Sequence, residues 1–169
     1  MKNKHLEMLT EINWNRMEYF ISMPDGSGNW IFGDGVYALR MPGAPLVKEG
    51  NDEILPHMIN FLDYAVCEHN KKPIMLPSVG YLKKKNKAMK FEYRIPIKMP
   101  DVEIFVNSML LYHMLKILPG AEAYSVDMEG YHLYKSGKAK ARAVYLVSEK
   151  GEGVLMPVIL PGRLCHENA

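Results

Sequence analysis

The fold class is decided by the stretch Val102–Gly120, VEIFVNSMLLYHMLKILPG. Its first five residues are rich in branched and aromatic side chains, which favour a half-buried strand. Asn107 is typical of a helix N-cap, because its side-chain oxygen can accept hydrogen bonds from the first free amides of a helix. Pro119-Gly120 then ends the helix, since proline cannot continue it and glycine accepts a reversed backbone. The stretch therefore predicts a strand, a capped helix and a sharp stop.

The predicted helix after Asn107 carries one wide apolar stripe at helical spacing. We expect the stripe to face the core, and it consists of Leu110, Leu111, Met114, Leu115 and Leu118. The more polar face contains Ser108, Tyr112, His113 and Lys116. A lone histidine on such a face is typical of a surface or boundary position, and contact of His113 with DNA or a partner is the alternative.

Towards the N-terminus the patterns alternate between helix and strand. The expected elements are a helix over 4–16, a strand over 17–23, a turn over 24–29, a hairpin over 30–40 and a helix from about 51 to 70. The hairpin is favoured because Gly33-Asp34-Gly35 separates two short apolar runs. Asn51 or Asp52 caps the second helix, and Cys67 falls on its apolar side, which predicts a buried free thiol.

Towards the C-terminus strands predominate. We expect strands over 74–76, 91–97, 123–127, 131–134, 141–147 and 154–160, with a basic run over 81–90. The pattern is strand–helix–strand twice over, which predicts an α+β fold with helices on one side of antiparallel sheets. The length fits one domain over 1–169, and 77–90 is the best place to divide it.

Composition indicates an ordinary globular protein, with 48% hydrophobic and 24% charged residues. Cys67 and Cys165 are the only cysteines, which favours a reducing compartment over a disulfide framework. The first residues lack the apolar core of a signal peptide, and no run approaches the length of a membrane span. We therefore expect a cytoplasmic protein without membrane contact.

Charge is distributed unevenly between the two halves. Residues 1–80 contain seven Lys or Arg and ten Asp or Glu, whereas residues 81–169 contain fourteen and nine. Two basic clusters stand out in the second half: Lys83, Lys84, Lys85, Lys87 and Lys90 form one, and Lys135, Lys138, Lys140 and Arg142 form another at a predicted hairpin. Tyr81, Tyr131 and Tyr134 lie beside them, and bases can stack on such rings. The alternative is a solvated loop whose lysines protect strand edges.

Residues 102–160 resemble one repeat of the DNA sliding-clamp fold found in bacterial polymerase processivity clamps. The resemblance is carried by Val106-Asn107, Leu111, Leu115, Lys116, Leu118-Pro119 and the terminal Val154–Leu160, VLMPVIL. It implies that such helices line a basic channel around DNA. It also implies that the closing strand helps to form an apolar cleft for partner peptides, which here would use Met156, Pro157, Val158 and Leu160.

Metal sites have only weak support. Asp25-Gly26-Ser27-Gly28-Asn29 is similar to the start of a calcium loop, but Trp30 and Val36 stand where that loop requires glycine and glutamate. The pairs Cys67–His69 and Cys165–His166 lack the spacing of a structural zinc finger. We predict no metal and no cofactor.

Motifs for catalysis are missing as well, since the sequence contains no nucleophile elbow, P-loop, dinucleotide fingerprint or metalloprotease signature. We predict no catalytic residue. The leading hypothesis is a non-enzymatic protein that binds DNA or the replication or defence machinery, in keeping with a phage or mobile-element origin. The alternatives are a protein-binding inhibitor or adaptor, and a small metal-dependent hydrolase or nuclease. A homodimer joined through sheet edges is also expected from the resemblance.

Overall fold

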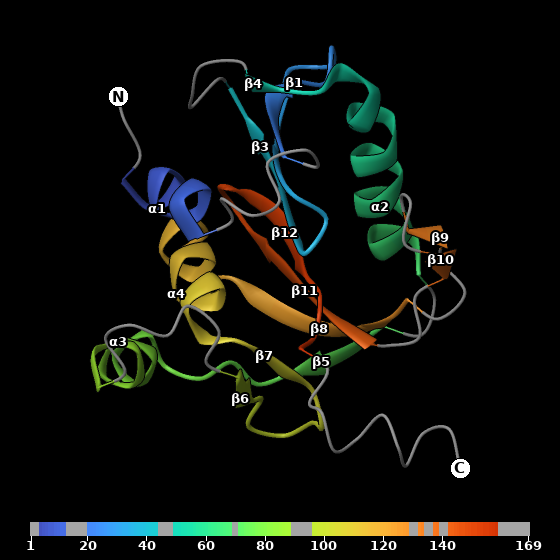
Figure 1. The fold of residues 1–169 in the computed structure, drawn as a ribbon. Helices are drawn as coiled ribbons and strands as arrows, with labels where there is room; N and C mark the ends of the chain where they lie inside the picture. Colours follow the sequence, from blue (N-terminus) through green and yellow to red (C-terminus); the bar gives the residue numbers. More distant parts are fainter. Residues whose placement is uncertain are drawn as a thin grey trace.

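A large antiparallel sheet forms the centre of the computed structural model, which describes residues 4–12, 20–43, 49–68, 71–88, 96–128, 132–133, 137–138 and 142–158 (Figure 1). Its strands are β1 Ile21–Pro24, β2 Asn29–Gly33, β3 Tyr37–Pro42, β4 Glu49–Gly50, β5 Lys72–Ile74, β8 Glu122–Asp127, β11 Arg142–Ser148 and β12 Gly151–Leu155. They are ordered β4-β1-β2-β3-β12-β11-β8-β5. Strands from both sides of residues 77–90 thus share one sheet.

Two small strand pairs and four α-helices complete the described fold. The pairs are β6 Pro96–Lys98 with β7 Phe105–Asn107, and β9 His132–Leu133 with β10 Gly137–Lys138. The helices are α1 Lys4–Ile12, α2 Leu55–Cys67, α3 Val79–Ala88 and α4 Ser108–Ile117, with a short 3-10 turn η2 Asp52–Ile54 before α2. Within the described ranges no helix is long and apolar enough to cross a membrane.

The sheet is buried on both faces, because neighbouring residues of each strand point in opposite directions. Tyr37 and Leu39 of β3 join the core cluster that contains α1 and α4, whereas Ala38 between them joins the cluster that contains α2. Figure 1 shows α1 and α4 on one side of the sheet and α2 on the other. The predicted α+β class with an antiparallel sheet is confirmed. The expectation that the helices lie on one side is wrong, because both faces of the central strands are apolar.

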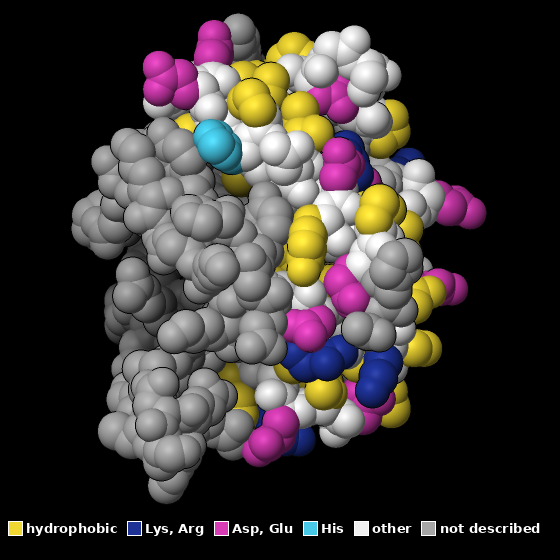
Figure 2. Space-filling view, turned by 90° about the vertical axis from the view of Figure 1, so that its right-hand side faces the viewer, with side chains coloured by type: hydrophobic (Ala, Val, Ile, Leu, Met, Phe, Trp, Pro, Cys, Tyr) yellow, Lys and Arg dark blue, Asp and Glu magenta, His cyan; other side chains and the backbone are white. Residues whose placement is uncertain are grey.

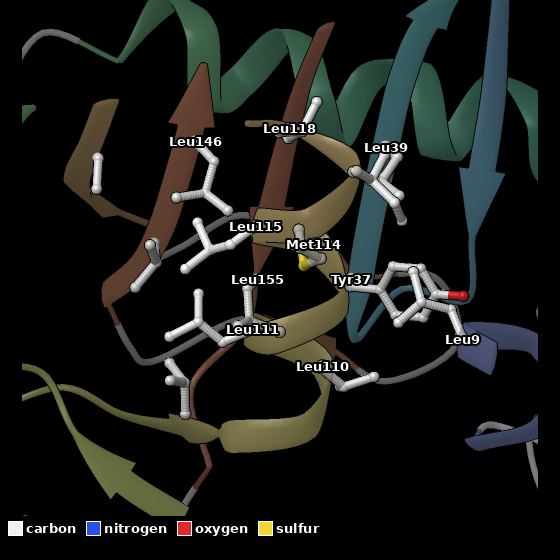
Figure 3. Packing of buried hydrophobic residues seen from close by; sticks show 14 of the residues in the cluster. Leu9, Tyr37, Leu39, Leu110, Leu111, Met114, Leu115, Leu118, Leu146 and Leu155 are labelled. Carbon is white, nitrogen blue, oxygen red and sulfur yellow. The ribbon is translucent and has the colours of Figure 1, made fainter. Parts of the chain in front are cut away.

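Helix α4 packs its apolar stripe directly on the middle of the sheet. Figure 3 shows Leu111 and Leu115 on the side of α4 that faces Leu146 and Leu155. The helix crosses β12 where Gly153 stands, and a Cβ atom there would lie 2.9 Å from the Met114 methyl and 2.8 Å from a Leu39 methyl. Glycine at this position therefore leaves room for the ends of both side chains.

The ends of α4 agree with the sequence prediction. The Asn107 side-chain oxygen accepts hydrogen bonds from the amides of Met109 at 2.9 Å and Leu110 at 3.2 Å. Gly120, after the helix, has a φ of +71°, a left-handed conformation that suits glycine. On the face expected to be more polar, however, Ser108 and His113 are buried. They are buried because α1 and α3 pack against the outer side of α4.

Several predicted boundaries differ from those in the structure. The last strand is Gly151–Leu155, not 154–160, and the strand before α4 is Phe105–Asn107. The basic run, for which a solvated loop was the alternative to a nucleic-acid surface, forms helix α3. The hairpin of β2 and β3 and the Asn51 cap before α2 are as predicted.

The two edges of the large sheet are β4 and β5. Strand β4 is two residues long, and β5 carries Pro73, which has no amide hydrogen to donate, beside the exposed Lys72. Short strands, edge prolines and edge lysines are features that hinder pairing with another chain. The homodimer through sheet edges stays a prediction, and these edges do not favour it.

The packing of α4 predicts the cost of truncating its stripe. Leu115 is 7% exposed, so we expect Leu115→Ala to lower the free energy of unfolding by about 2–5 kcal/mol through lost burial and the cavity that remains. The exposed neighbour Lys116 provides the control, and Lys116→Ala should change stability by less than about 0.5 kcal/mol. Urea unfolding measures both. Equal stability of the two variants would contradict the packing described for α4.

Candidate nucleic-acid interface

Helix α3 is fixed to the rest of the molecule through one side. Ser78 caps it, since the Ser78 hydroxyl accepts a hydrogen bond from the Tyr81 amide at 3.0 Å. Leu82 is completely buried in the core that contains α4. One turn later, the Ser108 hydroxyl donates to the Asn86 side-chain oxygen at 2.5 Å, and the Asn86 amide group donates to the Ser108 carbonyl at 3.4 Å. Residues 82 and 86, four apart, therefore define the inner side of α3.

The remaining sides of α3 are exposed and basic. The exposed side chains are Tyr81, Lys83, Lys84, Lys85 and Lys87. We call the four lysines the α3 lysine face. In the part of the chain that the structure describes, none of them forms an ion pair. Lys87 lies one turn from both Lys83 and Lys84, and like charges at this spacing destabilise a helix by about 0.2–0.5 kcal/mol per pair. Packing holds α3 in place despite this repulsion.

Both predicted basic clusters extend beyond the described residues. Lys90, Lys135 and Lys140 lie outside the described residues, as do Tyr131 and Tyr134. Lys138 lies in β10, which pairs with β9, whereas the predicted second strand of that hairpin, over 141–147, forms β11 and pairs with β8 and β12. Arg142 is half-buried in β11 and donates a hydrogen bond to the Ser125 hydroxyl at 3.1 Å. This arginine therefore contacts a neighbouring strand of the sheet.

The predicted peptide-binding stretch follows β12. Met156, Pro157 and Val158 are half-buried, and Leu160 lies outside the described residues. The amide of Met156 donates to the Val36 carbonyl at 2.8 Å, and the amide of Val158 donates to the Phe105 carbonyl at 2.7 Å. These bonds attach the stretch to the β2–β3 turn and to β7.

A histidine pair joins α1 to α4. The Nδ1 atoms of His5 and His113 lie 3.0 Å apart, close enough for one ring to donate to the other. His113 is 6% exposed, so the predicted surface or boundary position is wrong. Burial, followed by the nearby charges of His5 and Lys4, lowers the pKa of His113 to about 4. Burial and the charges of Lys116 and Lys4 also lower the pKa of His5. Sequence reasoning missed His5 because its partner is 108 residues away.

A charged network lies on the other face of the sheet, beside α2. Arg40 forms an ion pair with Glu152, and its Nη1 atom donates to Asp63 at 2.7 Å. The Tyr145 hydroxyl donates to the second oxygen of Glu152 at 2.6 Å, and burial, then this carboxylate, raises the Tyr145 pKa. Burial alone would lower the Arg40 pKa, but its two carboxylate partners outweigh it and raise the pKa. The network pairs its charges internally, and the Asp63 carboxylate is its most exposed group.

The surface beside this network is mixed in character. Figure 2 shows acidic, basic and hydrophobic side chains interspersed over the described part of the face that bears α2. A hollow of about 440 Å³ lies next to β5 and contains Glu122 and Tyr124, whose hydroxyl donates to that carboxylate at 3.0 Å.

The described residues bring together no group of three His, Cys, Asp or Glu side chains that could hold a metal ion. Cys67 is exposed, so the predicted burial of its thiol is wrong. It lies at the last residue of α2, where the helix extends beyond its buried stripe. Asp25 forms a plain turn, since its carboxylate accepts hydrogen bonds from the amides of Ser27 and Asn29.

Among the candidate sites described above, the α3 lysine face is the one that geometry supports best.

Comparison with protein-family models, with curated proteins and with solved structures finds no match to this chain. Any functional inference therefore depends on the residues and their geometry.

The histidine pair predicts a pH dependence of stability. The pKa of His113 in the folded state, about 4, lies below the value of about 6.5 expected in the unfolded chain. As the pH falls between these values, the unfolded chain takes up the proton first, so stability is complete above about pH 6.5 and decreases towards pH 4. Urea unfolding at about pH 7.5 and about pH 5 should show a smaller loss for His113→Asn than for the wild type. Equal losses of stability in the two proteins would contradict the assignment of this pH dependence to His113.

Proposed function

We propose that this protein is a non-enzymatic binding protein that contacts the phosphate backbone of nucleic acid through the α3 lysine face. The observation that carries the proposal is the exposure of Lys83, Lys84, Lys85 and Lys87 on one anchored helix, without an ion-pair partner among the described residues. Lysine ammonium groups act as point charges that suit phosphate oxygens, whereas base reading favours the planar fork of arginine. We therefore expect little preference for base sequence.

The way in which α3 is held supports this function. Leu82 and the Asn86–Ser108 hydrogen bonds fix the helix, so its lysines do not have to be ordered from a flexible loop before they bind. Binding to a polyanion would also relieve the repulsion between lysines one turn apart. Each phosphate contact would further release a counterion, which supplies affinity independent of sequence.

A clamp-like origin remains part of the proposal. The segment β7–α4–β8, on which the resemblance rests, has the expected strand–helix–strand order. Helix α4, however, lies between the sheet and the neighbouring helices α1 and α3, and Lys116 is its one exposed residue. We therefore assign the contact with nucleic acid to α3 and not to α4, the helix on which the resemblance rests.

The proposal predicts a steep dependence of binding on salt. With four phosphate contacts to duplex DNA, affinity should fall roughly 150-fold between about 50 mM and 200 mM salt, because the logarithmic slope is about −0.9 per contact. In the variant Lys83→Ala, Lys84→Ala, Lys85→Ala the slope should flatten by about one unit per lost contact. Fluorescence anisotropy with a labelled duplex at several salt concentrations measures both slopes.

A charge-matched variant provides the control for this experiment. Lys72, Lys98 and Lys150 are exposed on β5, on β6 and in the turn before β12, respectively. Replacing these three with alanine removes the same net charge and should leave the salt slope almost unchanged. If both triple variants weaken binding equally, only net charge matters and α3 is not the interface. If the wild type does not bind, a protein partner becomes the leading hypothesis.

A further inference from the structure

The outer surface of α3 carries one aromatic side chain among its lysines. Tyr81 is 50% exposed and lies in the first turn of the helix. Within the described part of the chain its ring packs against no other aromatic ring and its hydroxyl forms no hydrogen bond. The Tyr81 amide donates a hydrogen bond to the Ser78 hydroxyl, which leaves the side chain uninvolved in this cap. The folded protein thus leaves a large flat apolar group in water.

The positions of two lysines relative to this ring suggest its use. Lys84 and Lys85 follow Tyr81 by three and four residues, so all three side chains are neighbours on one side of the helix. Helical side chains also lean towards the N-terminus, which directs both lysines back towards the tyrosine. A flat ring with two ammonium groups beside it matches one unstacked base with its adjoining phosphates.

We infer that α3 binds single-stranded nucleic acid, with the Tyr81 ring stacked on an unpaired base while Lys84 and Lys85 contact neighbouring phosphates. This inference rests on the proposed function and adds the class of partner. Duplex DNA offers the same phosphates, but its bases are stacked on each other and leave no face for a ring beside the backbone. Single-stranded DNA and RNA share the required chemistry, so the sugar is left to the experiment.

The test compares Tyr81→Ala, Tyr81→Phe and wild type by fluorescence anisotropy with oligo(dT), oligo(rU) and a DNA duplex. Loss of stacking should lower single-strand affinity about 5- to 150-fold in Tyr81→Ala, the range that base–aromatic stacking supplies. Tyr81→Phe keeps the ring and should bind as the wild type does. The affinity for duplex should be the same in all three proteins. Tyr64→Ala, which removes an exposed tyrosine from α2, should change nothing.

The outcomes separate this inference from the proposed function. A loss in Tyr81→Ala with oligo(dT), oligo(rU) or both supports the inference and identifies the accepted sugar. If Tyr81→Ala binds all three probes like the wild type, while the alanine triple at Lys83, Lys84 and Lys85 weakens them, the inference is overturned and the proposed function stands. If Tyr81→Ala lowers the affinity for single strands and for duplex equally, stacking on an unpaired base is overturned as well. If the wild type binds none of the probes, both proposals fail.

Discussion

The close approach of helix α4 to strand β12 is the constraint on which the rest of the structure depends. Gly153 leaves room for the Met114 methyl, which packs from the helix onto the central strands. That position buries the stripe containing Leu111 and Leu115 against both β11 and β12. Beneath α4, strands from both ends of the chain meet where β3 pairs with β12, so segments far apart in sequence share one core.

The placement of α4 determines which surfaces remain for function. Its outer side is covered by α1 and by α3, which are attached through the His5–His113 pair and the Asn86–Ser108 pair. Helix α2 covers the opposite face of the sheet. On that face the charge of Arg40 is paired with those of Asp63 and Glu152. Helix α3 therefore becomes the outermost layer on its side, and its lysines point to solvent. The proposed activity follows from this layering, since an anchored helix with exposed cations suits a polyanion.

Local signals in the sequence predict the elements that they directly encode. The Asn107 cap, the Leu111–Leu115 stripe and the hairpin around Gly33–Gly35 each lie within a few residues and were predicted correctly. Helix α3 was missed because Leu82 is the one fully buried side chain among its residues 79–87 and its lysines show no helical periodicity. The burial of His113 depends on a residue more than a hundred positions away. The exposure of the lysines was predictable from charge, but their common helix was not.

The central claim is that the α3 lysine face is the surface that contacts nucleic acid. Labelling of lysines with an amine-reactive reagent, mapped by mass spectrometry with and without single-stranded DNA, tests it most directly. The account predicts that DNA protects Lys83, Lys84, Lys85 and Lys87, while the exposed Lys72 and Lys150 react equally in both samples. Unchanged labelling of the α3 lysines under conditions in which the DNA is bound would contradict the account.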